Sequence, residues 1–234
     1  MTSIWPRGLR RFLLAISAAA CLAACGNAPV QPDWLVNSYG ALGDFAKAYL
    51  AGNSKIADIE LARARREIGS TGRPDLLARA GLVRCAERVA SLELDDCAAT
   101  ATAGAEVAAP ERAYADYLGA RWQSLDAARV ALLPEQHRSI LASRDDGARR
   151  ATLAAMPDPL ARLIAAGALF QQGQLSPAGV EIAVNTASEQ GWRRPLLAWL
   201  GVQLKLADAA GDAAGKARIQ RRIDVALSGA PVNP

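Results

Sequence analysis

Recurring glycine and proline breaks are the feature that most constrains the fold of this chain. Glycine is favoured just past the end of a helix and proline in the first turn of the next, so each break predicts one helix ending and another beginning. The longer breaks are Gly72 to Pro74, Gly191 to Pro195 and Gly229 to Pro231, and the shorter ones are Gly52-Asn53, Gln172-Gly173 and Gly211-Asp212. Such regular punctuation predicts a series of helices joined by tight turns.

Apolar residues between the breaks recur with the period of a helix. Ala57, Leu61, Ala64 and Ile68 fall on one face, and charged residues occupy the other face. We expect helical hairpins at 38–51 with 54–69, 158–172 with 175–190, and 195–210 with 212–228, further helices near 110–128, 134–143 and 145–155, and a loop or frayed helix at 98–109. Segment 195–210 is apolar nearly all round, which predicts a helix buried between neighbours. Gly201 would permit a close crossing there, and ordinary packing is the alternative explanation for it.

The predicted fold class is all-α, because strand patterns hardly appear. Pro159, Pro195 and Pro231 recur every 36 residues, close to the length of a tetratricopeptide repeat. Segment 159–228 resembles two tetratricopeptide-like units, around Ala-Leu-Phe-Gln-Gln-Gly-Gln at 168–174 and Ala-Asp-Ala-Ala-Gly-Asp at 207–212. The usual Trp-Leu-Gly-Tyr pattern is not kept, so stacked tetratricopeptide-like hairpins and an irregular helical bundle remain equal alternatives.

The N-terminus has the features of a secretory signal. Arg7, Arg10 and Arg11 precede an apolar stretch at 12–24, which is too short to cross a bilayer permanently. The tetrapeptide Leu22-Ala23-Ala24-Cys25 at its end resembles the lipobox of bacterial lipoproteins. The resemblance implies cleavage before Cys25 and lipidation of its thiol. The alternative is an ordinary signal with Cys25 incidental. Cys21 fits less well, because Ala18 stands where the leucine should be.

The lipoprotein resemblance also implies a location. The residue after Cys25 is Gly26, not the aspartate that retains lipoproteins in the inner membrane, so we expect the periplasmic face of the outer membrane. The predicted organisation is a signal peptide at 1–24, a lipidated cysteine and tether at 25–33, an all-helical domain at 34–228 and a tail at 229–234.

Charge argues against a nucleic-acid partner. Three of the 27 basic residues lie in the signal segment, which has no acidic residue, so the mature chain sets 24 basic against 23 acidic residues. Arginines alternate with acidic residues, and aromatic residues make up 5% of the chain. A nucleic-acid interface needs a basic face and aromatic platforms, so that class of partner is excluded.

Two cysteines remain once Cys21 leaves with the signal and Cys25 becomes the anchor. Cys85 and Cys97 predict one disulfide in an oxidising periplasm. A redox or metal role is the less supported alternative, because the pair lacks Cys-x-x-Cys spacing and histidine partners.

Catalytic motifs are missing from the sequence. The single histidine, His137, lies on a charged helical segment, where we expect a solvated side chain. No Gly-x-Ser-x-Gly, His-Glu-x-x-His or Gly-x-x-x-x-Gly-Lys motif occurs. Carboxylates are abundant, but none is placed by a motif. We therefore expect no catalytic residue, cofactor or metal site.

Two groups of residues are candidates for binding. Trp192, Arg193 and Arg194 lie in a turn between helices, and tryptophan and arginine are enriched at interaction hot spots. The alternative is that Trp192 packs on the core and the arginines are solvated. The second group is Trp34 and Tyr39 with Phe45 and Tyr49, of which the last two should staple the first helix to the body. Contact of these aromatic side chains with lipid is the less supported alternative.

The combined features predict a membrane-anchored periplasmic adaptor or assembly factor. It would attach to the membrane through its lipid and bind an envelope protein or peptide through a helical surface. The alternative is a cell-wall-directed enzyme or small-ligand binder with an unidentified carboxylate site. A purely structural envelope protein is the third hypothesis.

Overall fold

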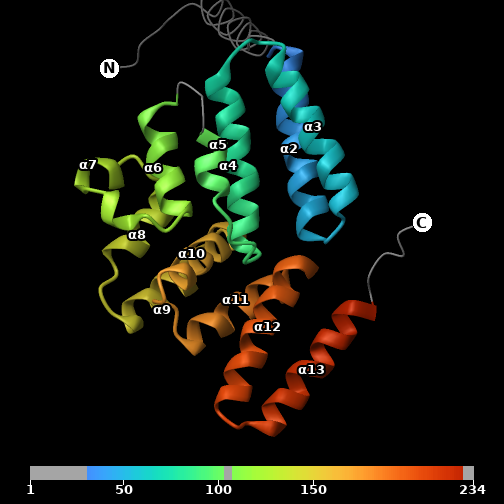
Figure 1. Ribbon diagram of the computed structural model, residues 1–234, viewed down its shortest axis with the longest axis vertical. Coiled ribbons are helices and arrows are strands. Elements are labelled where there is room, and N and C mark those ends of the chain that lie inside the picture. The colour runs from blue at the N-terminus through green and yellow to red at the C-terminus, as the bar shows by residue number, and fades with distance from the viewer. Residues whose placement is uncertain (1–30, 103–106, 229–234) are drawn as a thin grey trace, which may run out of the picture. The chain divides into compact units, whose positions relative to one another are not determined.

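The computed structural model describes residues 31–102 and 107–228, and each regular element in those ranges is a helix (Figure 1). The predicted all-α class is confirmed. The signal peptide predicted at 1–24, the lipidation site Cys25 and the tail at 229–234 lie outside the described residues. None of the helices described has the length and hydropathy needed to span a membrane.

Twelve α-helices and one 3-10 turn make up these ranges. In chain order they are α2 (Asp33–Leu50), α3 (Ser54–Gly69), α4 (Pro74–Ala90), α5 (Cys97–Thr102), α6 (Ala109–Leu118), the 3-10 turn η1 (Trp122–Ser124), α7 (Ala127–Val130), α8 (Glu135–Ala142), α9 (Asp146–Ala155), α10 (Pro159–Gln171), α11 (Pro177–Glu189), α12 (Arg193–Ala209) and α13 (Ala213–Ser228). The three predicted hairpins correspond to α2 with α3, α10 with α11, and α12 with α13. The helix predicted at 110–128 is shorter than expected, because Gly119 ends α6 and Ala120 takes a positive φ of 54°.

The helix ends follow the predicted glycine breaks. Gly52, Gly72, Gly173, Gly191 and Gly211 all have positive φ, a conformation that costs glycine least. After α11, for example, the amides of residues 191 and 192 donate to the last-turn carbonyls of residues 188 and 187, at 3.1 and 3.0 Å. This is the bonding pattern of a Schellman cap. It reverses the chain within two residues and starts the next helix.

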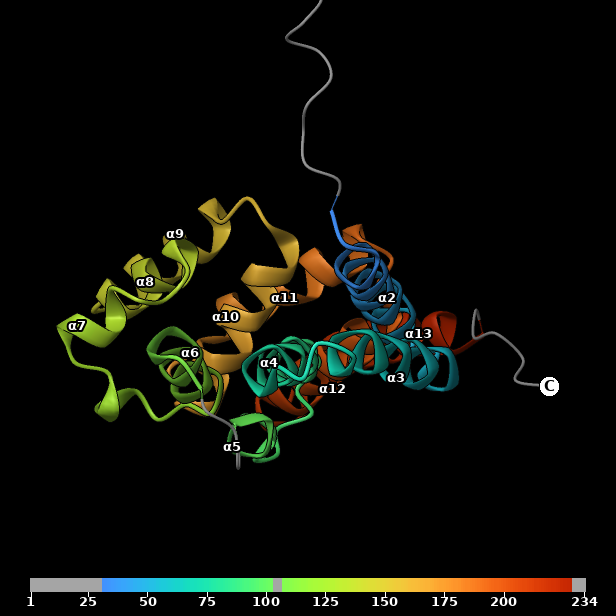
Figure 2. The same ribbon diagram turned by 90° about the horizontal axis from the view of Figure 1, so that it is seen from above.

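Helices α4 and α10 form the centre of the core. Helix α4 contacts α3, α5, α6 and α10, and α10 also contacts α6, α8, α9 and α11. They cross closely at Gly167, where a Cβ atom would fall 2.9 Å from Cγ1 of Val89 and closer still to its carbonyl oxygen. Helices α7–α9 lie on one side of this pair and α2 and α3 on the other (Figure 2).

Helix α12 is less buried than its sequence predicts. It packs against α11 and α13, and Trp199 anchors it by donating from Nε1 to the carbonyl of Ala90 at 3.0 Å. Its buried residues are only Pro195, Trp199 and Leu200, and Leu206 is 38% exposed. The expected all-round burial is wrong because neighbouring helices cover only part of its circumference. The expected crossing at Gly201 is also wrong, since no atom lies within 4 Å of a Cβ built there.

The predicted disulfide is confirmed. Cys85 in α4 is bonded to Cys97, the first residue of α5, and their Cα atoms are 5.5 Å apart. Both residues are buried in the main core. The bond holds the six-residue helix α5 against α4, within a segment that the sequence predicted to be a loop or frayed helix.

Candidate functional site

A groove follows the open face of α12 between α11 and α13. It consists of two hollows, of about 420 and 410 Å³, which share Arg218 and Arg222. The lining residues, which define the α12 groove, are Ser188, Leu196, Leu200, Arg218, Arg221, Arg222, Val225 and Ala226 in the first hollow, and Pro177, Ala178, Glu181, Gln203, Leu206, Arg218, Ile219 and Arg222 in the second. Helices α11 and α13 supply the two walls of the groove, and α12 supplies its floor.

Three arginines of α13 give the groove its charge. Arg218 and Arg221 are exposed and Arg222 is half-buried. Among the described residues, no carboxylate forms an ion pair with any of them, and the acidic residues of this region bind elsewhere: Asp208 pairs with Lys216, and Asp224 accepts from Gln220. Glu181 is the one acidic side chain among the lining residues. The groove is therefore apolar along its floor and positively charged along one wall.

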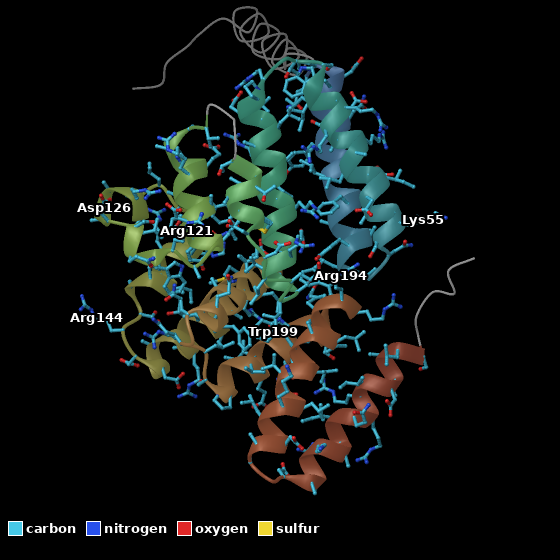
Figure 3. All side chains as sticks on the ribbon, viewed as in Figure 1. Lys55, Arg121, Asp126, Arg144, Arg194 and Trp199 are labelled. Carbon is cyan, nitrogen blue, oxygen red and sulfur yellow. A yellow bond between two sulfur atoms is a disulfide. The ribbon has the colours of Figure 1, made fainter. Side chains whose placement is uncertain are left out.

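Arg194, one of the two arginines of the predicted binding turn, is hydrogen-bonded to other parts of the chain. Arg194 donates from Nε to the carbonyl of Tyr49 at 2.7 Å, from Nη1 to Oε1 of Glu93 at 2.8 Å and from Nη2 to Oγ of Ser54 at 2.6 Å. Its guanidinium also lies 4.2 Å from the centroid of the Tyr49 ring. Figure 3 shows Arg194 where α12 approaches the lower ends of α2, α3 and α4. This placement differs from the expected solvated arginine.

The neighbours of Arg194 are also close to the body of the protein. Trp192 packs against both apolar clusters, and the guanidinium of Arg193 lies beside Gly52, where a Cβ would fall 2.9 Å from Nη2. Partner binding by Trp192, Arg193 and Arg194 stays a prediction. The structure gives Arg194 an architectural role, with a side chain that is 20% exposed.

Phe45 and Tyr49 hold the first helix, α2, against the body of the protein, as predicted from the sequence. Phe45 and Tyr49 are buried, with ring centroids 5.7 Å apart, in a cluster with Leu50, Ala57 and Leu61. Burial and the nearby Glu93 raise the pKa of the Tyr49 hydroxyl. Tyr39 is 81% exposed and takes no part in the cluster.

His137 is buried, so the prediction of a solvated histidine is wrong. It is 2% exposed, and its ring centroid lies 4.7 Å from that of Tyr117 and 5.7 Å from that of Tyr114. The reason is helical register: His137 and Ile140 are the two buried residues of α8, and they share its inward face. Burial lowers the pKa of His137 to about 4, and its Nδ1 has no hydrogen-bond partner among the described residues.

Glu87 is a buried carboxylate that the sequence analysis missed. It is 2% exposed on α4, and burial, followed by the charge of Asp158, raises its pKa to about 8. One local signal exists: Glu87 lies in helical register with Ala80 and Ala90, which are buried on the same helix. A lone carboxylate on an apolar face is a candidate for a neutral, protonated group.

Glu87 and His137 have the shifted pKa values that are common at active sites. However, both are enclosed, and neither lines any of the hollows described in this part of the chain. A pocket of about 390 Å³ lies nearby, with walls that include Leu82, Leu133 and Tyr114 and with Glu111 at its edge. The buried groups are therefore separated from any ligand that this pocket could take.

The described residues contain no group of three or more His, Cys, Asp or Glu side chains placed to hold a metal ion. No protein-family model, curated protein or solved structure matches the chain.

Proposed function

We propose that the protein is a lipid-anchored adaptor or assembly factor that binds an envelope protein at the periplasmic face of the outer membrane. The lipobox-like Leu22-Ala23-Ala24-Cys25 and the following Gly26 support the anchor and the location. The disulfide between Cys85 and Cys97 supports an oxidising compartment, because such bonds are rare in reducing ones.

The α12 groove is the observation that carries the binding role. Leu206 is 38% exposed and Val225 is 71% exposed, so apolar surface remains open at the edges of the groove. Apolar side chains surrounded by arginines are typical of protein interfaces, where the centre is apolar and the rim polar. A partner seated here would cover these side chains without any rearrangement of α12.

In-cell crosslinking tests this proposal. A photoreactive amino acid is placed at Gln203, which lines the groove, in the full-length lipidated protein. The control places it at Lys55, an exposed residue of α3. We expect one envelope protein to crosslink in stoichiometric amount from position 203 and not from position 55. Equal capture from both positions, or none from either, would contradict the proposal.

The pocket beside α6 supports a second candidate, a small-ligand binder. Its walls are mostly apolar, and Oε2 of Glu111 has no hydrogen-bond partner among the described residues, although Oε1 accepts from Arg79 at 3.0 Å. Soluble cell-wall fragments should then raise the melting temperature of the wild type and not of Glu111→Gln. An equal shift in both proteins would place any binding elsewhere.

A further inference from the structure

We propose that the occupant of the α12 groove is an acidic amphipathic helix, about four turns long, supplied by the partner. This inference rests on the proposed adaptor function and names the chemistry of the segment that it would bind. It follows from the charge of the α13 wall, the spacing of the floor residues and the extent of the two hollows along the walls.

The charge of the groove favours an acidic occupant. One wall of the groove carries the guanidinium groups of Arg218, Arg221 and Arg222, and none of them has a carboxylate partner among the described residues. Glu181 is the one acidic residue of the lining. Unpaired charge at the rim of an interface steers an oppositely charged partner and excludes one of like charge. An acidic segment would complete ion pairs that the chain itself leaves unmade.

The floor of the groove favours a helix. Leu196, Leu200, Gln203 and Leu206 of α12 line it, at positions i, i+4, i+7 and i+10 of one helix. Leu200 is fully buried beneath this stripe, so the surface on which another helix would pack its own apolar residues consists of Leu196, Gln203 and Leu206. A bound segment would therefore need apolar side chains one helical turn apart on one face and acidic side chains on the face toward α13.

The walls set the length of the occupant. Helix α13 has 16 residues, which corresponds to about 24 Å at the rise of an α-helix. The two hollows together reach from the first turn of α11 at Pro177 to Ala226 near the end of α13. A helix of about 16 residues would contact the whole groove. A flat lipid surface would meet the exposed guanidinium groups but would not enter between α11 and α13.

Peptide binding to the full-length mature lipoprotein in detergent tests the inference. The probe is a fluorescent helical peptide of about 16 residues, with leucine at the floor-facing positions, glutamate at the positions that face α13, and alanine or glutamine elsewhere. One comparison peptide replaces each glutamate by lysine, and another scrambles the order so that the leucines no longer share a face. We expect the first peptide to bind roughly tenfold or more tightly than either comparison peptide.

Substitutions in the groove supply the matched controls. The double variant Arg218→Glu/Arg222→Glu should weaken binding of the acidic peptide by roughly tenfold. Arg144→Glu, which reverses an exposed arginine outside the groove, should leave it unchanged. Thermal melts and size-exclusion profiles that match the wild type would show that the variants remain folded and in the same oligomeric state. For a variant that fails this check, Arg218→Gln alone is measured with the same peptides.

Several outcomes would overturn the inference. The scrambled peptide could bind as tightly as the amphipathic one, or vesicles of anionic phospholipid could bind in an Arg218-dependent way while no peptide binds. A dimer that the double variant converts to monomers would assign the groove to a second copy of the chain. Capture of a partner from Gln203 without binding of the acidic peptide would leave the adaptor role standing and refute the helix. Peptide binding without any captured partner would refute the adaptor role and leave the preference of the groove for an acidic helix standing.

Discussion

Arginine side chains in this protein have two different roles at the scale of single residues. Arg194 makes three hydrogen bonds and a ring contact to segments from three other parts of the chain. Arg218 and Arg222 form no ion pair with the described residues and line an open groove. Composition cannot distinguish the two roles, because they depend on partners that lie far away in the sequence.

Arg194→Ala should lower the free energy of unfolding by about 2 kcal/mol, because the change removes the charged donor to the carbonyl of Tyr49 and leaves Glu93 with Arg88 as its ion-pair partner. Urea denaturation measures the loss. Arg194→Lys should recover only part of it, since an ammonium group cannot reproduce the planar fork of the guanidinium. The control Arg221→Ala should change stability by less than about 0.5 kcal/mol. Equal losses at both positions would refute the architectural role of Arg194.

Because of Glu87, the free energy of unfolding should fall as pH rises above about 6.5. Its pKa is raised from 4.5 to about 8 in the folded protein, so its favourable contribution is complete below 4.5 and is lost as pH rises to about 8. His137 acts oppositely: its pKa is lowered from 6.5 to about 4, so its contribution is lost as pH falls through that interval. The two effects offset one another between about 4.5 and 6.5, and above 6.5 only Glu87 remains.

We therefore expect a plateau followed by a loss of about 2 kcal/mol in the free energy of unfolding between pH 6.5 and 8. Urea denaturation across this range checks it. Glu87→Gln, which keeps a neutral side chain of similar size, should abolish the loss, whereas the exposed Glu189→Gln should retain it. A decline that persists unchanged in Glu87→Gln would show that another group is responsible.

Helix ends were predictable from sequence because their causes are local. Gly52, Gly173, Gly191 and Gly211 end helices through contacts within their own turns, and Asp158 caps α10 by accepting from the amides of residues 160 and 161. Burial of whole helices was less predictable. The apolar sequence of α12 indicates burial on all sides, but only the packed structure shows which of its faces lack a neighbouring helix. The α12 groove depends on that open face and could not be inferred from its arginines alone.

Two glycines in different helices should respond oppositely to the same substitution. Gly167→Ala should destabilise the protein by about 1–3 kcal/mol, because the new methyl group meets the backbone of Val89 where α4 and α10 cross. Gly201→Ala should stabilise it by about 0.4–1 kcal/mol, because the site is open and alanine favours the helix. Urea midpoints of the two variants test both signs. A stabilising Gly167→Ala would refute the close crossing.

At the scale of the whole molecule, the proposed lipid anchor at Cys25 is what would hold the helical domain at the membrane. Cys25→Ala should abolish lipidation and release the protein into the soluble periplasmic fraction. Cys21→Ala should leave it anchored, because Cys21 would be removed with the signal peptide. Membrane fractionation and intact-mass measurement distinguish the two variants. Persistent membrane association of Cys25→Ala would refute the lipobox interpretation.

The hydrogen bonds of Arg194 also impose an order of events on a newly made chain. Its acceptors at Tyr49 and Ser54 are synthesised about 140 residues earlier, so the hairpin of α2 and α3 cannot complete its contacts until α12 has been made. A chain that ends before Arg194 would leave Glu93 paired with Arg88 alone among the described residues, and the carbonyl of Tyr49 without its charged donor. The contacts that secure the first hairpin of the domain therefore depend on a residue of α12, which is synthesised much later.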